Sequence, residues 1–179
     1  TCALPILCDD IYEDLVYGQR PRPLLRICPD LADRTLMVGG ASKAYAMTGW
    51  RIGWGVGPKA LISAMSAIQS QTTSAPCSIS QAAALAAITG PQSEAARMRE
   101  TFKARRDLLV GLLDKIPGMS CPRPDGAFYA FPRIEGLLGA RTMKGQVLAT
   151  DVDVSAYLLD CAGVASVPGS AFGGPGHLR

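Results

Sequence analysis

The feature that most constrains the fold is a series of short apolar segments separated by long loops and helical runs. Residues 5–8 predict a buried strand that ends in two acidic residues, and residues 35–38 predict a second short strand. Residues 53–57 alternate glycine with larger apolar side chains, which is typical of a strand that packs closely against a neighbour. Strands separated by helices and long loops predict a layered α/β fold.

Helical periodicity follows the third predicted strand. The apolar residues after Pro58 recur at helical spacing, and we expect this stripe to face a core. They are Leu61, Ile62, Met65 and Ile68. Ser78 and Gln81 form a capping-box pattern before an alanine-rich run, which predicts a second helix. Residues 93–116 predict a long helix that bridges two domains.

The remainder of the chain predicts a smaller second region. Residues 127–131 alternate small and aromatic side chains as a strand does, residues 154–161 predict a helix, and residues 164–167 predict a final strand. We therefore place a domain boundary near the middle of the long helix, which gives a first domain of residues 1–100 and a second of residues 101–179.

Composition excludes several classes of protein. With 48% hydrophobic residues, the 179-residue chain has enough apolar surface for a packed core. The formal charge of +3 comes from scattered lysines and arginines, which argues against a nucleic-acid partner and favours a small anionic ligand. No stretch is long enough to span a membrane, so we expect no membrane partner.

The cysteine and histidine patterns argue against a metal site. No CxxC pair occurs, and the only histidine is His177. We expect reduced thiols, as in cytosolic proteins, and no metal ligands. The cysteines are Cys2, Cys8, Cys28, Cys77, Cys121 and Cys161. Because the sequence opens on Thr1 and runs almost at once into a strand, we also expect it to be part of a longer chain.

Two segments carry residues suited to chemistry: DDIYE at residues 9–13 and SKAYAMTGWRIGWGVGP at residues 42–58. They contain an Asp-x-x-Tyr at one strand end, a Ser-Lys at a second, and an arginine eight positions after the lysine. This order and separation closely resembles the fold-type I pyridoxal-phosphate-dependent aminotransferases, and among them the bacterial aspartate aminotransferases. The resemblance continues through TTSAPCSISQAAALAAITGP, PDGAFYAFP and VPGSAFGGPGHLR, so it covers nearly the whole chain.

The resemblance implies a fold and an assembly. Residues 1–100 would form the C-terminal part of the large cofactor-binding domain, and residues 101–179 the small α+β domain, truncated here. The family's N-terminal half is missing from this sequence. In the family the TTSAP segment lies near the subunit boundary, so the resemblance also implies a homodimer.

The resemblance assigns cofactor contacts residue by residue. Lys43 would hold pyridoxal 5'-phosphate covalently and act as the catalytic base, Asp9 would pair with the pyridine nitrogen, and Tyr12 would bond to the phenolic oxygen. Arg51 and Ser42 would anchor the phosphate, for which a planar guanidinium is well suited. Read singly, each would be ordinary: a solvated lysine, a turn aspartate, a half-buried tyrosine, a surface arginine.

Other residues receive simpler interpretations. By resemblance Arg179 would bind the substrate α-carboxylate, whereas a frayed terminal charge is the alternative. Asp10 lies outside the Asp-x-x-Tyr spacing and is expected to be structural. The alternating glycines of residues 53–57 are not followed immediately by a helix, which argues against a dinucleotide loop. We expect the aromatic residues to be core residues: Trp50, Trp54, Phe128 and Tyr129.

The resemblance implies amino-group transfer between an amino acid and a 2-oxo acid, with aspartate and 2-oxoglutarate as the favoured pair. An aromatic amino-acid or prephenate aminotransferase is the nearest alternative. A ligand-sensing domain of a transcription regulator is another, although no helix-turn-helix is present. A structural remnant without cofactor is disfavoured because Asp9, Tyr12, Lys43 and Arg51 are all intact.

Overall fold

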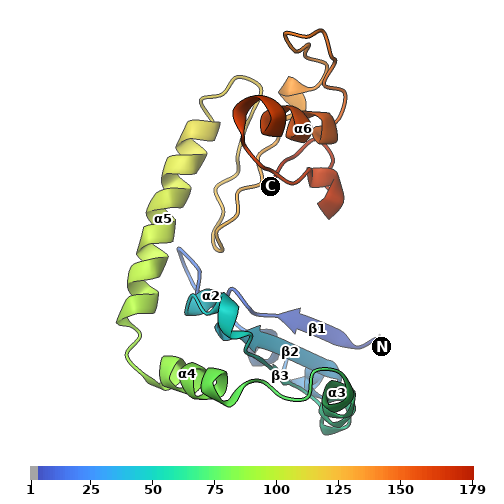
Figure 1. Ribbon diagram of the computed structural model, residues 1–179. Coiled ribbons are helices and arrows are strands. Elements are labelled where there is room, and N and C mark those ends of the chain that lie inside the picture. Colours follow the sequence, from blue (N-terminus) through green and yellow to red (C-terminus); the bar gives the residue numbers. More distant parts are fainter. Residues whose placement is uncertain (1–3) are drawn as a thin grey trace. The chain divides into compact units, whose positions relative to one another are not determined.

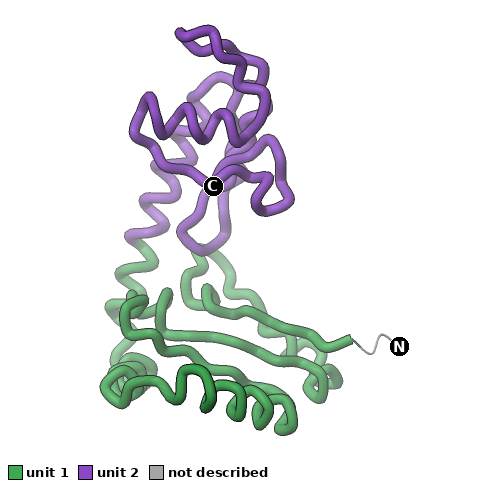
Figure 2. Tube along the Cα trace, turned by 45° about the vertical axis from the view of Figure 1, so that its right-hand side comes forward, with its two compact units in different colours: residues 1–100 green, residues 101–179 purple. Residues whose placement is uncertain are grey.

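The computed structural model describes residues 4–179 and contains two compact units, Thr1–Glu100 and Thr101–Arg179 (Figure 2). Cys2 lies outside the described residues. The other cysteines are free thiols, as predicted: Cys8, Cys28, Cys77, Cys121 and Cys161.

The first unit is built on a three-stranded sheet (Figure 1). The strands β1 (Ile6–Asp9), β2 (Thr35–Gly40) and β3 (Gly53–Val56) lie in the order β1-β2-β3. β2 runs parallel to β1 and antiparallel to β3. The three predicted strands are therefore confirmed, and the carboxyl ends of β1 and β2 lie at the same edge as the first residue of β3.

Glycine in β2 and β3 is explained by the close approach of these strands. A Cβ atom on Gly39 would lie 2.7 Å from Nε1 of Trp54, and one on Gly53 would lie 2.9 Å from the carbonyl oxygen of Gly39. Real Cβ atoms do not approach other heavy atoms so closely, so larger residues would push the strands apart. The close packing predicted for residues 53–57 is confirmed.

Short helices connect the three strands, and longer helices follow β3 (Figure 1). They are α1 (Leu24–Ile27), η1 (Pro29–Arg34), α2 (Ala41–Ala44), η2 (Thr48–Trp50), α3 (Lys59–Thr72), α4 (Ser78–Thr89) and α5 (Ser93–Leu113). The long helix α5 begins in the first unit and continues into the second.

The predicted capping box of α4 is wrong. The residue before the helix is Cys77, and no side chain caps it. Gln81 instead turns its side-chain amide to the preceding loop, where Nε2 donates to the carbonyl oxygen of Pro76 at 2.9 Å. The predicted end of the helix is confirmed, because Gly90 occupies its C-cap.

The predicted burial of β1 is wrong, and that of the α3 stripe is confirmed only in part. Leu7 is 67% exposed and Ile68 is 66% exposed, and β1 alternates between half-buried and exposed residues. Ile62 and Met65 of α3 do lie over β3, because a Cβ atom on Gly55 would be 3.9 Å from Cδ1 of Ile62 and 3.6 Å from Cε of Met65. The buried residues of this unit gather instead around Ala41, Met47 and Ala84.

The second unit contains η3 (Glu135–Leu137), α6 (Asp151–Ala162) and η4 (Gly169–Phe172) in addition to the end of α5. Its core consists of Ile134, Leu148, Val154 and Leu178. The helix predicted at residues 154–161 is confirmed as α6. It begins at a capping box in which Thr150 Oγ1 accepts from the Asp153 backbone at 3.2 Å and Asp153 accepts from the Thr150 backbone at 2.8 Å.

Neither strand predicted in the second unit forms. Residues 127–131 begin with a bend at Ala127, whose φ of 57° interrupts an extended chain. Residues 164–167 lead into a single antiparallel bridge between Pro168 and Leu178. Arg133 makes two further isolated bridges, to Ser120 and His177, so this unit replaces a regular sheet with short paired segments.

Candidate functional site

One edge of the sheet collects the predicted cofactor residues of the first unit. Asp9 is the last residue of β1, Lys43 lies in the short helix that directly follows β2, and Arg51 lies two residues before β3. In the register of the sheet, Asp9 is opposite Val38 and Gly40 is opposite Gly53. Ligands of open α/β sheets bind at the carboxyl ends of the parallel strands, which is the edge where these residues lie.

Asp9 shapes the turn that carries Tyr12. Its Oδ1 accepts a hydrogen bond from the backbone of Ile11 at 3.2 Å, a turn typical of aspartate after a strand. Three residues beyond Tyr12 the chain is anchored again, because the Leu15 backbone donates to the Tyr12 carbonyl at 2.9 Å and the Leu15 side chain is buried. Asp9 itself is exposed and Tyr12 is half-buried, so both are accessible to a ligand at this edge.

The helix α2 presents Ser42 and Lys43 away from the core. Its first and last residues, Ala41 and Ala44, are buried and lie three positions apart, on one face of the helix. Ser42 and Lys43, which lie between them, are half-buried. Packing of the two alanines therefore orients the serine and the lysine toward the opposite face.

The loop from α2 to β3 holds Arg51 in an unusual backbone conformation. Ala46 has a φ of 53° and Arg51 a φ of 52°, both in the left-handed region that non-glycine residues rarely adopt. Met47, between them, is buried in the core cluster and fixes the loop. The exposed Arg51 side chain donates to the Thr48 carbonyl at 3.4 Å. Backbone strain of this kind is found at functional sites that the surrounding packing enforces.

Acidic residues lie next to this edge. The Oδ2 atom of Asp10 is buried and has no hydrogen-bond partner within residues 4–179. Burial, and then the charges of Asp14 and Asp10, raise the pKa of Glu13. Burial also raises the pKa of Tyr45, with smaller contributions from Asp14 and Glu13. Asp10, Glu13 and Tyr45 line a cavity of about 270 Å³. From sequence we expected Asp10 to be structural, and no sequence pattern predicted that its Oδ2 atom would be buried without a hydrogen bond among residues 4–179.

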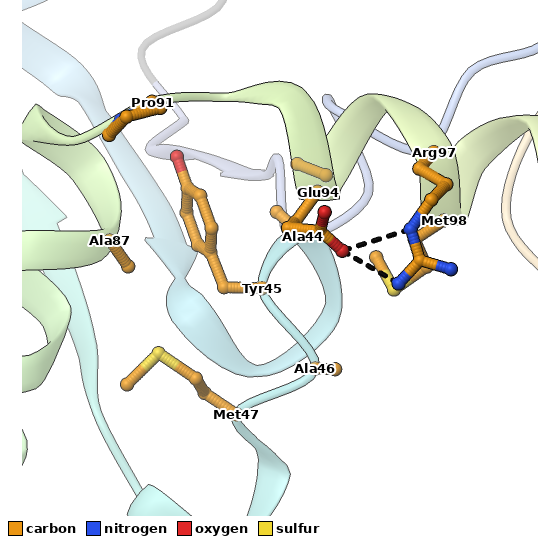
Figure 3. Close-up of a pocket in the computed structure, with 10 residues that line it drawn as sticks. Ala44, Tyr45, Ala46, Met47, Ala87, Pro91, Glu94, Arg97 and Met98 are labelled. Carbon is orange, nitrogen blue, oxygen red and sulfur yellow. Dashed lines mark hydrogen bonds and ion pairs between the residues drawn. The ribbon is translucent and has the colours of Figure 1, made fainter.

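A second cavity of the first unit lies beside α2 and α5. It has a volume of about 390 Å³ and is lined mostly by small or apolar residues (Figure 3). Tyr45 stands at its wall and donates a hydrogen bond to Oε1 of Gln92 at 3.1 Å. Figure 3 shows Glu94 bonded twice to Arg97, at 2.9 and 2.6 Å, both on α5. None of the predicted cofactor residues lines this cavity.

Arg179 belongs to the second unit, where its backbone is firmly held. Its carbonyl oxygen accepts from the Val167 backbone at 2.9 Å, and its own N–H donates to the Val167 carbonyl at 2.8 Å. The neighbouring Leu178 donates to the Pro132 carbonyl at 3.1 Å and is buried in the core. The guanidinium lies against the rings of Tyr129 and Phe172. The alternative of a frayed terminal charge is therefore wrong.

The four aromatic residues that we expected in the core are partly exposed. The exposed fractions lie between 37% for Tyr129 and 45% for Trp50. Trp54 contacts the glycine strand β2, and Phe128 packs on Tyr129 with ring centroids 4.9 Å apart. Tyr129 and Phe172 thus have a polar partner, Arg179, that sequence reasoning missed.

The described residues hold neither a candidate metal site nor a candidate membrane span. Residues 4–179 contain no group of three or more histidine, cysteine, aspartate or glutamate residues that could hold a metal ion. No helix among the same residues is long and apolar enough to cross a membrane.

Comparisons with known proteins agree with this architecture. The family model for aminotransferase class I and II matches residues 3–179. An aspartate aminotransferase of Rhizobium meliloti (strain 1021) is 53% identical over 169 residues, which cover 94% of this chain and 41% of that protein. A probable aspartate/prephenate aminotransferase of Rickettsia bellii (strain RML369-C) is 48% identical over 175 residues, which cover 97% and 44%.

A solved structure extends the likeness to three dimensions. The crystal structure of the aspartate aminotransferase from Rhizobium meliloti matches with a TM-score of 0.94 and 51% identity, over 97% of this chain and 44% of that one. The chain therefore spans less than half the length of the relatives it matches.

Proposed function

Because the chain belongs to the aminotransferase class I and II family, we propose that the whole protein transfers an amino group from an amino acid to a 2-oxo acid with pyridoxal 5'-phosphate as cofactor. The observation that carries this proposal is the meeting of Asp9, Lys43 and Arg51 at one edge of the sheet. Since the relatives are more than twice as long, other parts of the site belong to sequence beyond these residues.

The side chains at the sheet edge fit the cofactor group by group. A carboxylate suits a pyridine N–H, an amine suits an aldehyde, a phenol suits the ring oxygen, and a guanidinium with a hydroxyl suits a phosphate. The carboxylate comes from Asp9, the amine from Lys43 and the phenol from Tyr12. The guanidinium comes from Arg51 and the hydroxyl from Ser42. When bound, pyridoxal phosphate supplies an electron-withdrawing ring that stabilises negative charge at the substrate Cα.

Asp9 and Lys43 have different tasks in this proposal. The Asp9 carboxylate would favour the protonated form of the pyridine nitrogen, because an anion beside the ring stabilises its cationic form. Lys43 would hold pyridoxal phosphate through its Nζ amine, and the same Nζ would serve as the base that accepts the proton from the substrate Cα. A group that performs both steps must be accessible from the ligand side, and α2 directs Lys43 away from its buried face.

Arg51 and Ser42 bind the phosphate, and Arg179 binds the substrate α-carboxylate. A guanidinium presents a planar fork of donors that matches both anions. The two arginines thus fix opposite partners of the reaction: Arg51 the cofactor and Arg179 the substrate. Contacts of this kind orient a bound molecule and so lower the entropic cost of a reaction.

Aspartate with 2-oxoglutarate is the pair we propose, supported by relatives named as aspartate aminotransferases. Other relatives are named as aspartate/prephenate aminotransferases, and a similar solved structure is titled as an aromatic aminotransferase from Pyrococcus horikoshii OT3. These names keep prephenate or an aromatic amino acid as the second candidate substrate. The match of the enzyme family model over residues 3–179 favours catalysis over the regulatory alternative.

Assembly, location and domain identity are part of the same proposal. We assign Thr1–Glu100 to the C-terminal part of the large domain and Thr101–Arg179 to the small domain of a fold-type I enzyme. The exposed apolar faces of β1 and α3 support further covering elements. We propose that the whole protein is a homodimer in the cytoplasm.

Steady-state assays of the full-length protein test the function. With added cofactor, aspartate and 2-oxoglutarate should give oxaloacetate and glutamate, and Lys43→Ala should lower kcat by about 10²- to 10⁴-fold, the contribution typical of a positioned acid–base group. Lys59→Ala, at the exposed start of α3, is the matched control and should keep wild-type rates. Equal activity of Lys43→Ala and wild type would disprove the assignment, and faster turnover of prephenate would select the second candidate.

A further inference from the structure

Two aromatic rings lie against the guanidinium of Arg179. Its Cζ atom is 4.4 Å from the ring centroid of Tyr129 and 4.1 Å from that of Phe172. A cation within about 6 Å of an aromatic centroid is attracted by the ring's negative face. We propose that Tyr129 and Phe172 are positioning residues that hold the Arg179 guanidinium ready for a substrate carboxylate. This inference rests on the proposed function of Arg179.

Aromatic partners suit an arginine that must bind an external anion. An acidic side chain within the chain would occupy the guanidinium donors and compete with the substrate, whereas contacts with ring carbons leave the planar fork of N–H groups for a carboxylate. Among the described residues 4–179, Arg179 takes part in no salt bridge. Ring faces therefore contact the guanidinium, and its N–H donors remain available to a ligand.

The Phe172 ring is itself fixed from several sides. It lies edge-on to Phe131, with centroids 6.4 Å apart and planes at 82°. Phe131 stacks in turn on His177, at 4.8 Å and 8°. The backbone of η4, which ends at Phe172, is tied to α6 because the buried Asp151 carboxylate accepts from Ser170 N–H at 2.6 Å. These contacts hold the Phe172 ring in place beside the guanidinium.

Tyr129 approaches from a different segment. It follows the bend at Ala127 and packs against Phe128, whose ring also contacts Phe102 of α5 at 5.4 Å. Tyr129 is 37% exposed and Phe172 is 47% exposed. Two rings from separate segments therefore converge on one guanidinium.

The rings explain how a flexible side chain is ordered before the substrate arrives. The backbone hydrogen bonds between Arg179 and Val167 fix the Cα atom, but an arginine retains many rotamers beyond it. Ordering such a side chain only on binding weakens affinity, and prior contact with the rings reduces that loss. Removal of a ring should therefore raise KM more than it lowers kcat.

Steady-state kinetics of the full-length protein test the inference. Tyr129→Leu and Phe172→Leu should each raise KM for aspartate and for 2-oxoglutarate by about 3- to 30-fold, the range expected for losing one cation–ring contact. The expected change in kcat is much smaller. Tyr129→Phe keeps the ring and should restore most of the affinity. Tyr157→Leu removes a tyrosine that packs on the core cluster of the same unit, so it should lower stability without raising KM.

A double mutant separates positioning from general damage. In an Arg179→Ala background, Tyr129→Leu and Phe172→Leu should cause no further rise in KM, because the group they position is gone. The same losses in both backgrounds, or equal losses with an amine that lacks a carboxylate, would overturn the inference. If the wild type is active and the ring variants keep its KM, this inference is overturned and the proposed function stands. If the wild type is inactive, the proposed function is overturned as well.

Discussion

The two units of this chain hold their charged residues in different ways. In the first unit, strand ends and a short helix bring Asp9, Lys43 and Arg51 to one sheet edge, and the backbone does the positioning. In the second unit no regular sheet forms around Arg179, and two aromatic rings lie against its guanidinium. A sheet edge can thus place several groups at once, whereas an arginine on a short bridged segment depends on side-chain contacts.

Substitution of Arg179 tests the second-unit side of this comparison and should have the largest effect. Losing a charged contact with a carboxylate costs on the order of 2 to 5 kcal/mol, so Arg179→Ala should lower kcat/KM for aspartate by about 30-fold to several thousandfold. Arg179→Lys keeps the charge without the fork and should recover only part. Cofactor affinity should not change.

An amine without a carboxylate provides the control for Arg179. Its slow half-reaction should be nearly as fast in Arg179→Ala as in wild type, because the arginine has no partner on it. A loss as severe as that for aspartate would mean that Arg179 supports the fold of the second unit instead.

Substitution of Arg51 tests the first-unit side and should have an intermediate effect. Arg51→Lys keeps a positive charge at the strained position but loses the planar fork, so the Kd for pyridoxal phosphate should rise by roughly tenfold, the effect of one charge-assisted hydrogen bond. Fluorescence or absorbance titration of the full-length protein measures it. Arg26→Lys, on the exposed end of α1, is the matched control. Unchanged cofactor affinity in Arg51→Lys would remove Arg51 from the phosphate site.

The smallest expected effect is on the pH dependence of stability. It tests the hydrogen bond between Ser170 and Asp151 that holds η4, the helix that ends at Phe172. The backbone hydrogen bond from Ser170 is the main cause that lowers the pKa of Asp151, so the folded state favours its charged form. This stabilisation is complete above the ordinary carboxyl pKa of about 3.9 and is lost as pH falls through the lowered value. The Tm of wild type should therefore fall more steeply than that of Asp151→Asn between about pH 4 and pH 2. Parallel Tm curves would contradict this account.

The sheet-edge residues could be predicted from sequence because their signals are local. Each lies at or next to a strand end, and β1, β2 and β3 are marked by apolar runs and glycines that need close packing. The family resemblance, now confirmed, added the roles that local patterns alone could not assign. Those residue roles remain predictions until the variants are measured.

The parts that sequence missed depend on distant contacts. The capping pattern at Ser78 failed because Cys77, not Ser78, occupies the N-cap, and the Gln81 side chain donates to the Pro76 carbonyl. The strand expected at residues 127–131 failed because Ala127 adopts a positive φ, which alternation of side chains does not reveal. Arg179 and Tyr129 lie far apart in the chain, so no local sequence pattern predicts their contact.

The central claim is that Lys43 holds the cofactor. Reduction by borohydride fixes pyridoxal phosphate irreversibly on the lysine that carries it, and peptide mapping of the reduced full-length protein then identifies that residue. We predict a label on Lys43 that is absent without borohydride and absent in Lys43→Ala. A label on Lys59, Lys103, Lys115 or Lys144 instead, with Lys43 unmodified, would contradict the account.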